Sequence, residues 1–340
     1  MRPSLGGMEL RPVDIHDDAV MRDFHRVVDR ANHVDREDAP RLTCDEFVAA
    51  VRAPDSGERA DHVAAYDGDT MLGVATAYLF LLDNTDKGWL EVSVHPDHRG
   101  RGVGTALLDR VTSVVVAEGR SELIADSKIP FDRLDDHPYK AFAARHGFHQ
   151  SNIEVVRHLD LPVDDQRLEE WTALAGEKTD GYRIETYAGH FPAEYAESLC
   201  VLLGQLGVDA PTGDVDFEEE VMTPERLDER YAMSASMGRE TYESVALTPD
   251  GVVAAQSTLQ VPVNGSTDAF QWGTFVHREH RGHRLGLAVK TANLRAVQAR
   301  HTHLRRVTTQ NAETNEYMIW INELLGFRPV EASVEFVKRV

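Results

Sequence analysis

A strand-turn-helix segment that occurs twice places the strongest constraint on how this chain can fold. The first copy, Val92 to Asp109, reads VSVHPDHRGRGVGTALLD: an apolar run, a polar turn, a basic glycine loop and then a helical apolar pattern. The second copy, Gly273 to Asn293, reads GTFVHREHRGHRLGLAVKTAN and follows at a constant offset of 182 residues. Because this offset is about half the chain, the sequence predicts an internal duplication.

Each copy has the features of an anion site. Glycines leave room for backbone N–H groups to approach a phosphate closely. The helix that follows adds unpaired N–H groups and the positive end of its dipole. Arg99 and Arg101 bring side-chain charge to the first copy. A Rossmann dinucleotide site is disfavoured, because HPDHR separates the strand from the first glycine and the glycine spacing differs.

Composition limits the class of protein. A length of 340 residues suits about two domains. The net charge of −21 argues against a nucleic-acid partner and favours cationic ligands. Two cysteines form neither a disulfide framework nor a metal cluster, which is typical of a reduced, cytoplasmic protein. We expect no membrane span, because no run approaches about 20 apolar residues, and no signal segment.

The order of predicted elements repeats with the motif. In each half a short strand, a helix, a hairpin and the strand before the glycine loop precede the long helix, another strand, a helix that ends at Gly-Phe, and a last strand. Mixed strands and helices, with strands paired by hairpins, indicate an α/β or α+β fold. We expect an N-terminal domain at residues 1–165, a polar linker at 166–181 and a C-terminal domain at 182–340.

These motifs resemble the GNAT superfamily of acyl-CoA-dependent N-acyltransferases. Arg99-x-x-Gly102-x-Gly104 has the full family pattern, and Arg281-x-x-Arg284-x-Gly286 has it except for one arginine in place of a glycine. The resemblance implies two tandem domains, each with a mixed, mostly antiparallel sheet flanked by helices, an arrangement similar to that of mycothiol synthase.

The resemblance also implies where coenzyme A or acetyl-CoA binds. In this family the strand before the loop pairs with the pantetheine arm, and the glycine loop binds the diphosphate. The implied residues of the first half are Val92, Ser93, Val94, Arg99, Gly100, Arg101, Gly102, Val103, Gly104 and Thr105. Those of the second half are Thr274, Phe275, Val276, Arg281, Gly282, His283, Arg284, Leu285, Gly286, Leu287 and Asn315.

The expected catalytic positions match the family pattern less well than the glycine loops do. Many relatives place a glutamate on the central strand, eleven residues before the motif arginine, but Gly88 and Phe270 occupy those positions here. Glu91, Asp268 and Gln271 lie nearby, either as polar strand ends or as substitutes.

The last helix points to the second half. Relatives often carry an acid tyrosine four residues before the glycine of Gly-Phe, and an asparagine seven residues earlier. The first half has Ala143 and Asp136 there, whereas the second half has Asn322 and Asn315. We therefore take Asn315, Asn322, Gln271 and Asp268 as the catalytic candidates.

The resemblance implies an N-acyltransferase, with acetyl-CoA as the expected donor. Together with the acidic composition, it favours a small cationic amine such as an aminoglycoside- or streptothricin-like antibiotic, or its biosynthetic intermediate. Two alternatives stay open: acetylation of an aminosugar conjugate, as by mycothiol synthase, and a non-catalytic sensor that binds acyl-CoA. We expect a monomer or homodimer.

Overall fold

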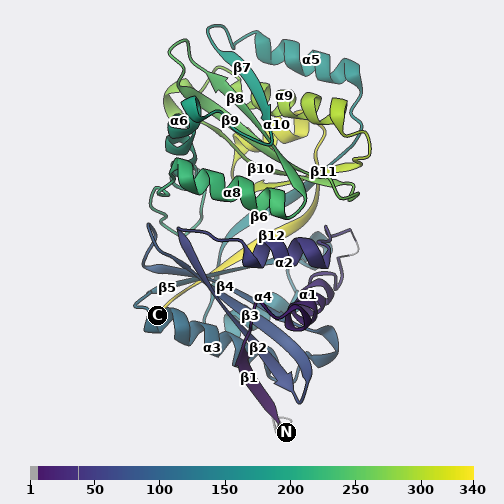
Figure 1. The fold of residues 1–340 in the computed structure, drawn as a ribbon, viewed down its shortest axis with the longest axis vertical. Helices are drawn as coiled ribbons and strands as arrows, with labels where there is room; N and C mark the ends of the chain where they lie inside the picture. The colour runs from purple at the N-terminus through teal and green to yellow at the C-terminus, as the bar shows by residue number, and fades with distance from the viewer. Residues whose placement is uncertain (1–6, 37) are drawn as a thin grey trace. The chain divides into compact units, whose positions relative to one another are not determined.

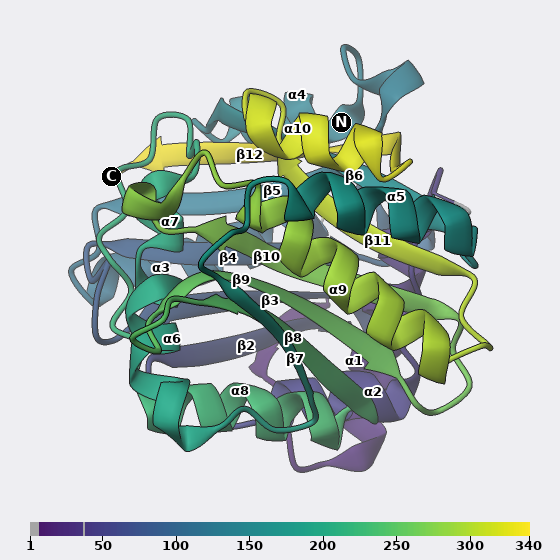
Figure 2. The same ribbon diagram turned by 90° about the horizontal axis from the view of Figure 1, so that it is seen from above.

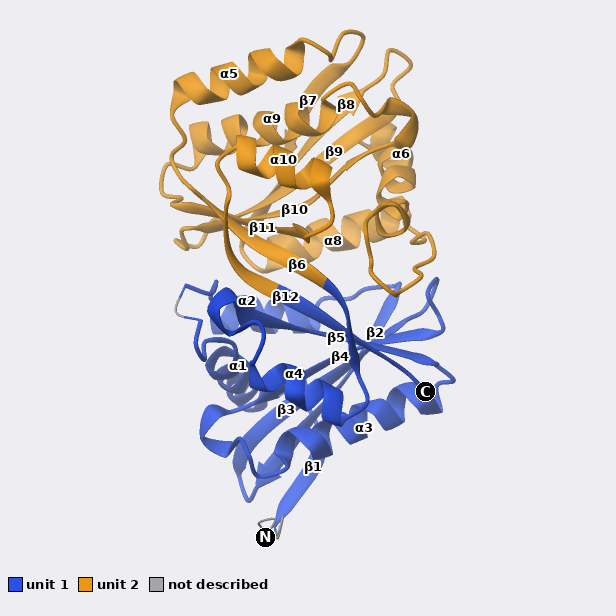
Figure 3. Ribbon diagram, turned by 180° about the vertical axis from the view of Figure 1, so that it is seen from behind, with its two compact units in different colours: residues 1–152, 333–340 blue, residues 153–332 orange. Residues whose placement is uncertain are grey.

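The computed structural model describes residues 7–36 and 38–340 and divides the chain into two compact units. Unit 1 comprises Met1–Asn152 together with Ser333–Val340, and unit 2 comprises Ile153–Ala332 (Figure 3). Each unit has a mixed, mostly antiparallel sheet flanked by helices (Figure 1), which confirms the predicted fold class.

Unit 1 is built on the strand order β1-β2-β3-β4-β5, and the end of β12 lies beside β5. Helix α3 packs on one face of the sheet, whereas α1 and α2 share a core with β2 and β3 on the other. The elements are β1 Met8–Pro12, α1 Asp18–Asn32, α2 Cys44–Arg52, β2 Glu58–Asp67, β3 Thr70–Phe80, β4 Lys87–Val94, η1 Pro96–His98, α3 Val103–Ala117, β5 Glu122–Pro130, η2 Phe131–Arg133 and α4 Pro138–Arg145.

Unit 2 repeats this plan with the order β7-β8-β9-β10-β11, followed by β6. Helices α6 and α8 cover one sheet face, and α5 lies beside α9 on the other (Figure 2). The elements are β6 His149–Asp160, α5 Asp165–Gly176, β7 Arg183–Ala188, α6 Ala193–Gly204, α7 Leu206–Asp209, α8 Pro224–Ser236, β8 Arg239–Leu247, β9 Val253–Pro262, β10 Asp268–Val276, η3 Arg278–His280, α9 Leu285–Arg300, β11 Arg306–Ala312, α10 Glu316–Leu324 and β12 Arg328–Arg339.

The two halves of the sequence exchange their last strands. Residues Glu154–Asp160 of β6, from the first half, pair antiparallel with β11 of unit 2. The end of β12, from the second half, belongs to unit 1, where the Val340 N–H donates to the Ser121 carbonyl at 2.9 Å. The compact units therefore divide at residues 152 and 332, not at the expected positions 165 and 182.

Most of the predicted linker is helix α5. Asp164 caps its N-terminus by accepting from the Gln166 N–H, and Leu168, Trp171 and Ala175 recur at helical spacing and are buried in the core of unit 2. The many charged residues between these apolar positions form the solvent face, which explains why the stretch resembles a linker in sequence.

In both sheets the central parallel strands separate after a short pairing. The register between β4 and β5 covers Lys87–Trp89, and that between β10 and β11 covers Asp268–Phe270. Beyond these residues each strand before the glycine loop has one edge without a parallel partner. Both gaps lie where the resemblance places the pantetheine arm.

The packing of α5 generates the first prediction. Trp171→Ala should destabilise unit 2 by about 3–5 kcal/mol, because it removes a large side chain that is 4% exposed in the core. Urea unfolding monitored by circular dichroism measures the loss. Glu169→Ala, on the exposed face of α5, serves as the control and should change stability by less than about 0.5 kcal/mol. Equal, small effects of both changes would contradict a packed α5.

Candidate functional site

The two glycine loops share one backbone geometry. Helix α3 begins after Gly102 at φ 87°, and α9 begins after Arg284 at φ 54°, both in the left-handed region. Neither helix has a side-chain cap, so the N–H groups of the first turn are available to an anion. In both loops the motif arginine donates to the last carbonyl of its strand, Arg99 to Val94 and Arg281 to Val276.

In unit 1 the basic groups of this loop have no acidic partner among the described residues. The Arg99 guanidinium also donates to the Ala31 carbonyl and lies 5.6 Å from the ring centre of Tyr139. Arg101 is exposed. The positive charge of the loop is therefore uncompensated, and with the uncapped helix it fits the diphosphate of coenzyme A.

In unit 2 the corresponding charges are already paired. Asp209, on the short helix α7, accepts from Arg278 at 2.6 Å and from Arg281 at 2.7 Å. Arg284, where the family pattern has glycine, donates to the Leu174 carbonyl and to Glu177 on the C-terminal end of α5. These carboxylates supply the negative charge that a phosphate would otherwise bring.

Two of the predicted catalytic side chains have structural partners in unit 2. Asp268 forms two hydrogen bonds with Arg306, each 3.1 Å long, across the β10–β11 pair. The Gln271 amide donates to Ser257 and to the Thr258 carbonyl, and its Oε1 is buried without a partner. Neither group is positioned as a free proton acceptor.

The two asparagines are engaged as well. Asn315 caps α10 by accepting from the Met318 N–H. Asn322 is fully buried, accepts from Lys290 at 2.7 Å and donates to Asn311 at 2.9 Å. Both asparagines therefore have structural partners, and both ends of the Asn322 amide are used by the core.

Two carboxyl groups have a pKa raised into the neutral range: Glu91 on β4 of unit 1, and the buried Glu243 on β8 of unit 2, whose pKa burial raises to about 8. Of these, Glu91 lies on the strand before a glycine loop. The Tyr78 hydroxyl donates to Glu91 at 3.4 Å. Glu91 is an exposed residue, but the protein atoms around its carboxyl exclude enough water to raise the pKa to about 7, and the charge of Asp126 adds to this rise. The Tyr78 hydrogen bond and Lys128 act in the opposite direction.

Glu91 lies on the sheet face that α1 covers. Its β3 partner is Thr76, whose hydroxyl is 2.9 Å from the His62 ring nitrogen on β2. Gly88 lies on the opposite face, where an added Cβ would meet Val115 of α3 at 2.6 Å. A larger side chain therefore has no room at Gly88, the position where many relatives carry the glutamate. In the sequence, only its place on the predicted strand pointed to Glu91.

Unit 2 has no carboxylate at the position that corresponds to Glu91. At the offset of 182 residues Gly273 stands in place of Glu91. An added Cβ at Gly273 would meet Leu206 of α7 at 2.9 Å. Helix α7 thus places Leu206 against the position that corresponds to Glu91, and its Asp209 pairs with the loop arginines.

The histidines of the turns have local roles. The Nδ1 atoms of His95 and His277 accept from the N–H groups two residues later, and His280 contacts the Tyr182 hydroxyl at 2.9 Å. Within the described ranges no cluster of three or more His, Cys, Asp or Glu residues could hold a metal ion. None of the helices described there is long and apolar enough to cross a bilayer.

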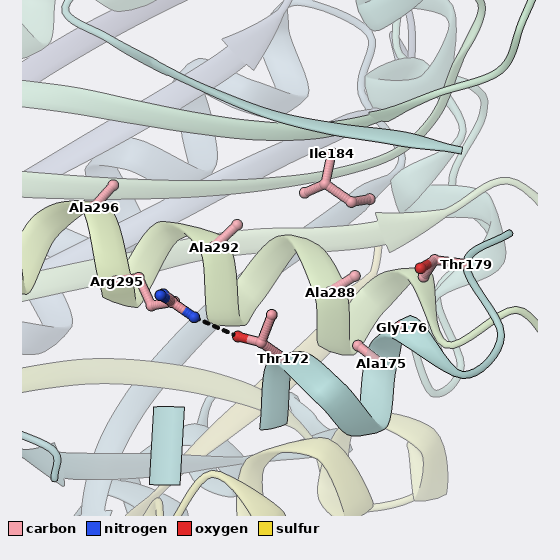
Figure 4. A pocket seen from close by; sticks show the side chains of 9 residues that line it. All are labelled: Thr172, Ala175, Gly176, Thr179, Ile184, Ala288, Ala292, Arg295 and Ala296. Atoms are coloured by element: carbon pink, nitrogen blue, oxygen red, sulfur yellow. Dashed lines mark hydrogen bonds between the residues drawn. The ribbon is translucent and has the colours of Figure 1, made fainter. Parts of the chain in front are cut away.

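A hollow of about 540 Å³ lies between α5, α9 and β7 of unit 2 (Figure 4). Alanines of α5 and α9 form much of its wall, and Arg295 donates to Thr172 at 3.0 Å. None of the predicted site residues lines this hollow, so it is separate from the predicted acyl-CoA and catalytic positions.

Comparison with known proteins agrees with this geometry. Residues 58–150 match the family model of the acetyltransferase (GNAT) domain. Mycothiol acetyltransferase from Rothia mucilaginosa (strain DY-18) is 29% identical over 127 residues, which cover 37% of this chain and 35% of that protein. The match therefore spans about a third of that relative.

Solved structures extend the likeness to the whole chain. A tandem GNAT protein from the clavulanic acid biosynthesis pathway superposes with a TM-score of 0.75 at 26% identity, covering 98% of both chains. A GCN5-related N-acetyltransferase from Sphaerobacter thermophilus has the same fold, with a TM-score of 0.65 at 16% identity and coverage of 98% and 95%. Residues 58–150 thus form a GNAT acetyltransferase domain, and the fold of the whole chain is that of a tandem GNAT protein.

The buried Asn322 network generates the second prediction. Burial, with the charge of Arg157 added, lowers the pKa of Lys290 to about 7, whereas an unfolded lysine titrates near about 10.4. Above pH 7 the unfolded chain binds a proton that the folded chain does not. The unfolding free energy should therefore rise with pH by up to about 1.4 kcal/mol per unit.

Urea unfolding from about pH 7 to about pH 9 measures this rise. Lys290→Met should flatten it, and Lys338→Met, on a half-exposed lysine, should leave it unchanged. A rise of the same slope in Lys290→Met would assign the effect to other groups.

Proposed function

We propose that this protein is an acetyl-CoA-dependent N-acetyltransferase whose reaction takes place in unit 1. The observation that carries the proposal is the pairing of Glu91, whose pKa is about 7, with a glycine loop whose arginines have no carboxylate partner among the described residues. Unit 2 supports this choice, since Gly273, Leu206 and Asp209 occupy the corresponding positions.

The residues that would hold acetyl-CoA are those of β4 and its loop. Val92, Ser93 and Val94 lie beyond the point where β4 leaves β5, and Arg99 to Thr105 form the uncapped helix start. A Cβ added at Gly104 would lie 3.5 Å from the side chains of Phe142 and Val94, an ordinary contact distance. Acetyl-CoA supplies an activated carbonyl with a thiolate leaving group.

Glu91 supplies the proton acceptor. An ammonium group must lose a proton before its nitrogen can attack, and a carboxyl with a pKa near 7 is ionised in enough of the protein to accept it at neutral pH. Backbone N–H groups on the unpaired edge of β4 are the expected donors to the carbonyl oxygen. This mechanism uses none of the four catalytic candidates that the sequence indicated in unit 2.

The proposed substrate is a small cationic amine. Glu91 and Asp126 provide negative charge near the site, and the chain carries −21 overall. An aminoglycoside- or streptothricin-like antibiotic, or a precursor of one, fits this charge, and the clavulanic acid pathway of the structural relative favours specialised metabolism. The similarity to mycothiol acetyltransferase keeps an aminosugar conjugate as the second candidate.

We retain the remaining expectations as part of the proposal. The negative charge favours a small-molecule partner over nucleic acid. The cysteines Cys44 and Cys200 are both free, as suits a reducing, cytoplasmic compartment. The protein would act as a monomer or homodimer.

The location of the donor site generates the third prediction. Gly104→Val should weaken binding of acetyl-CoA at least about tenfold, because a branched side chain shields the first N–H groups of α3. Gly286→Val, the matched change in unit 2, should leave the affinity unchanged. Isothermal titration calorimetry with acetyl-CoA measures both. Loss of binding in Gly286→Val alone would place the donor in unit 2.

The role of Glu91 generates the fourth prediction. Thiol release from acetyl-CoA with a panel of polyamines, aminoglycosides and aminosugar conjugates identifies the best acceptor. With that acceptor kcat/KM should rise with pH and level off above about pH 7, as Glu91 loses its proton. Glu91→Gln should lower kcat about 10²–10⁴-fold and abolish this inflection.

Glu118→Gln, at an exposed ion pair with Arg59, is the matched control and should behave like the wild type. Binding of acetyl-CoA without thiol release for any amine would favour the sensor over the enzyme.

A further inference from the structure

A three-membered hydrogen-bond network joins β5 to the last strand of the chain within unit 1. Lys128 Nζ donates to Asp126 Oδ2 at 2.9 Å and to Ser333 Oγ at 2.8 Å. Ser333 Oγ donates in turn to Asp126 Oδ2 at 3.0 Å. The serine hydroxyl thus accepts from the lysine and donates to the carboxylate, and every pair in the network is bonded.

Ser333 enters this network from a distant part of the sequence. It is 205 residues from Lys128, yet it belongs to the same compact unit and is 4% exposed. The end of β12 is held along β5 by two further contacts: Arg339 Nε bonds Glu122 at 3.0 Å, and the Val340 N–H donates to Ser121. The strand that carries the hydroxyl is therefore fixed beyond the network.

Glu91 and Asp126 occupy corresponding positions on neighbouring strands. The parallel register of β4 and β5 pairs Lys87 with Glu122, and each of the two carboxylates lies four residues further along its strand. The charged and titratable groups that influence the Glu91 carboxyl are Asp126 and Lys128 on β5 and Tyr78 on β3. Asp126 disfavours the ionised form of Glu91 and Lys128 favours it. Asp126 accepts from two donors, and both it and Lys128 share a contact with Ser333.

We propose that Ser333 is a positioning residue of the unit 1 acyl-transfer site, which holds the opposed charges of Asp126 and Lys128 in place beside Glu91. This inference rests on the proposed function of Glu91. It gives the second half of the chain a part in the chemistry of the first unit, because that half supplies the hydroxyl. Without the hydroxyl the Lys128–Asp126 pair keeps only its direct contact of 2.9 Å and loses the group that ties both charges to β12, so its influence on Glu91 should weaken.

The test measures this influence without substrate. The full-length protein, labelled with [5-¹³C]glutamate, is titrated by NMR, and the Glu91 carboxyl is assigned from its loss in Glu91→Gln. Asp126→Asn should lower the Glu91 midpoint by about one pH unit, because it removes a neighbouring negative charge. In the Ser333→Ala background the same change should shift the midpoint by less than half as much.

Two further variants make the result specific. Ser333→Thr keeps the hydroxyl and should restore the full shift. Ser234→Ala removes a buried serine hydroxyl elsewhere, one that accepts from Thr241 in unit 2, and should keep the full shift. An equal effect of Asp126→Asn with and without the Ser333 hydroxyl would overturn the inference.

Calorimetry with acetyl-CoA and the pH dependence of kcat/KM are recorded on the same proteins. Absence of acetyl-CoA binding by the wild type would contradict the proposed function whatever the titration gives. The alternative outcome is normal binding and turnover, with Asp126→Asn shifting the Glu91 inflection equally with and without Ser333→Ala. That result would contradict only the role of Ser333.

Discussion

The separation of the central parallel strands is the constraint on which the rest of each unit depends. A strand inside a sheet normally satisfies its backbone groups on both edges, and unpaired groups are costly when water is excluded. In unit 1 β4 pairs with β5 only over Lys87–Trp89, while it pairs with β3 up to Val94. The free edge of β4 leads directly into the glycine loop. A ligand with an extended arm and a charged end can satisfy both features together.

The duplicated halves have kept this backbone and diverged in the side chains that make it useful. Unit 1 has Glu91 beside the free edge and a loop whose charge is uncompensated. Unit 2 has Gly273 covered by Leu206, and Asp209 pairs with two loop arginines. The difference continues into the core, where Lys290 in unit 2 stands at the offset position of Leu108 in unit 1. A buried lysine that donates to the Asn322 amide replaces ordinary apolar packing there.

The exchange of the last strands brings residues of the second half of the sequence into unit 1. β12 ends in unit 1, and Ser333 reaches a carboxylate and a lysine that act on Glu91. The second half of the chain thus supplies both a strand and a hydroxyl group to unit 1.

The sequence by itself determined the duplication, the order of elements and the two glycine loops, because these depend on local spacing of glycine, arginine and apolar residues. It did not reveal that residues 165–176 form a packed helix, since a helix with a narrow apolar stripe reads as a charged linker. It placed the catalytic asparagines in unit 2, where Lys290 and Asn311 use the Asn322 amide. Only the tertiary structure shows how differently the two glycine loops are surrounded. In unit 2 Asp209 contacts arginines about 70 residues away, and in unit 1 Asp126 and Lys128 contact Ser333 across more than 200 residues. Local sequence patterns do not predict such contacts, because burial and charge act through space rather than along the chain.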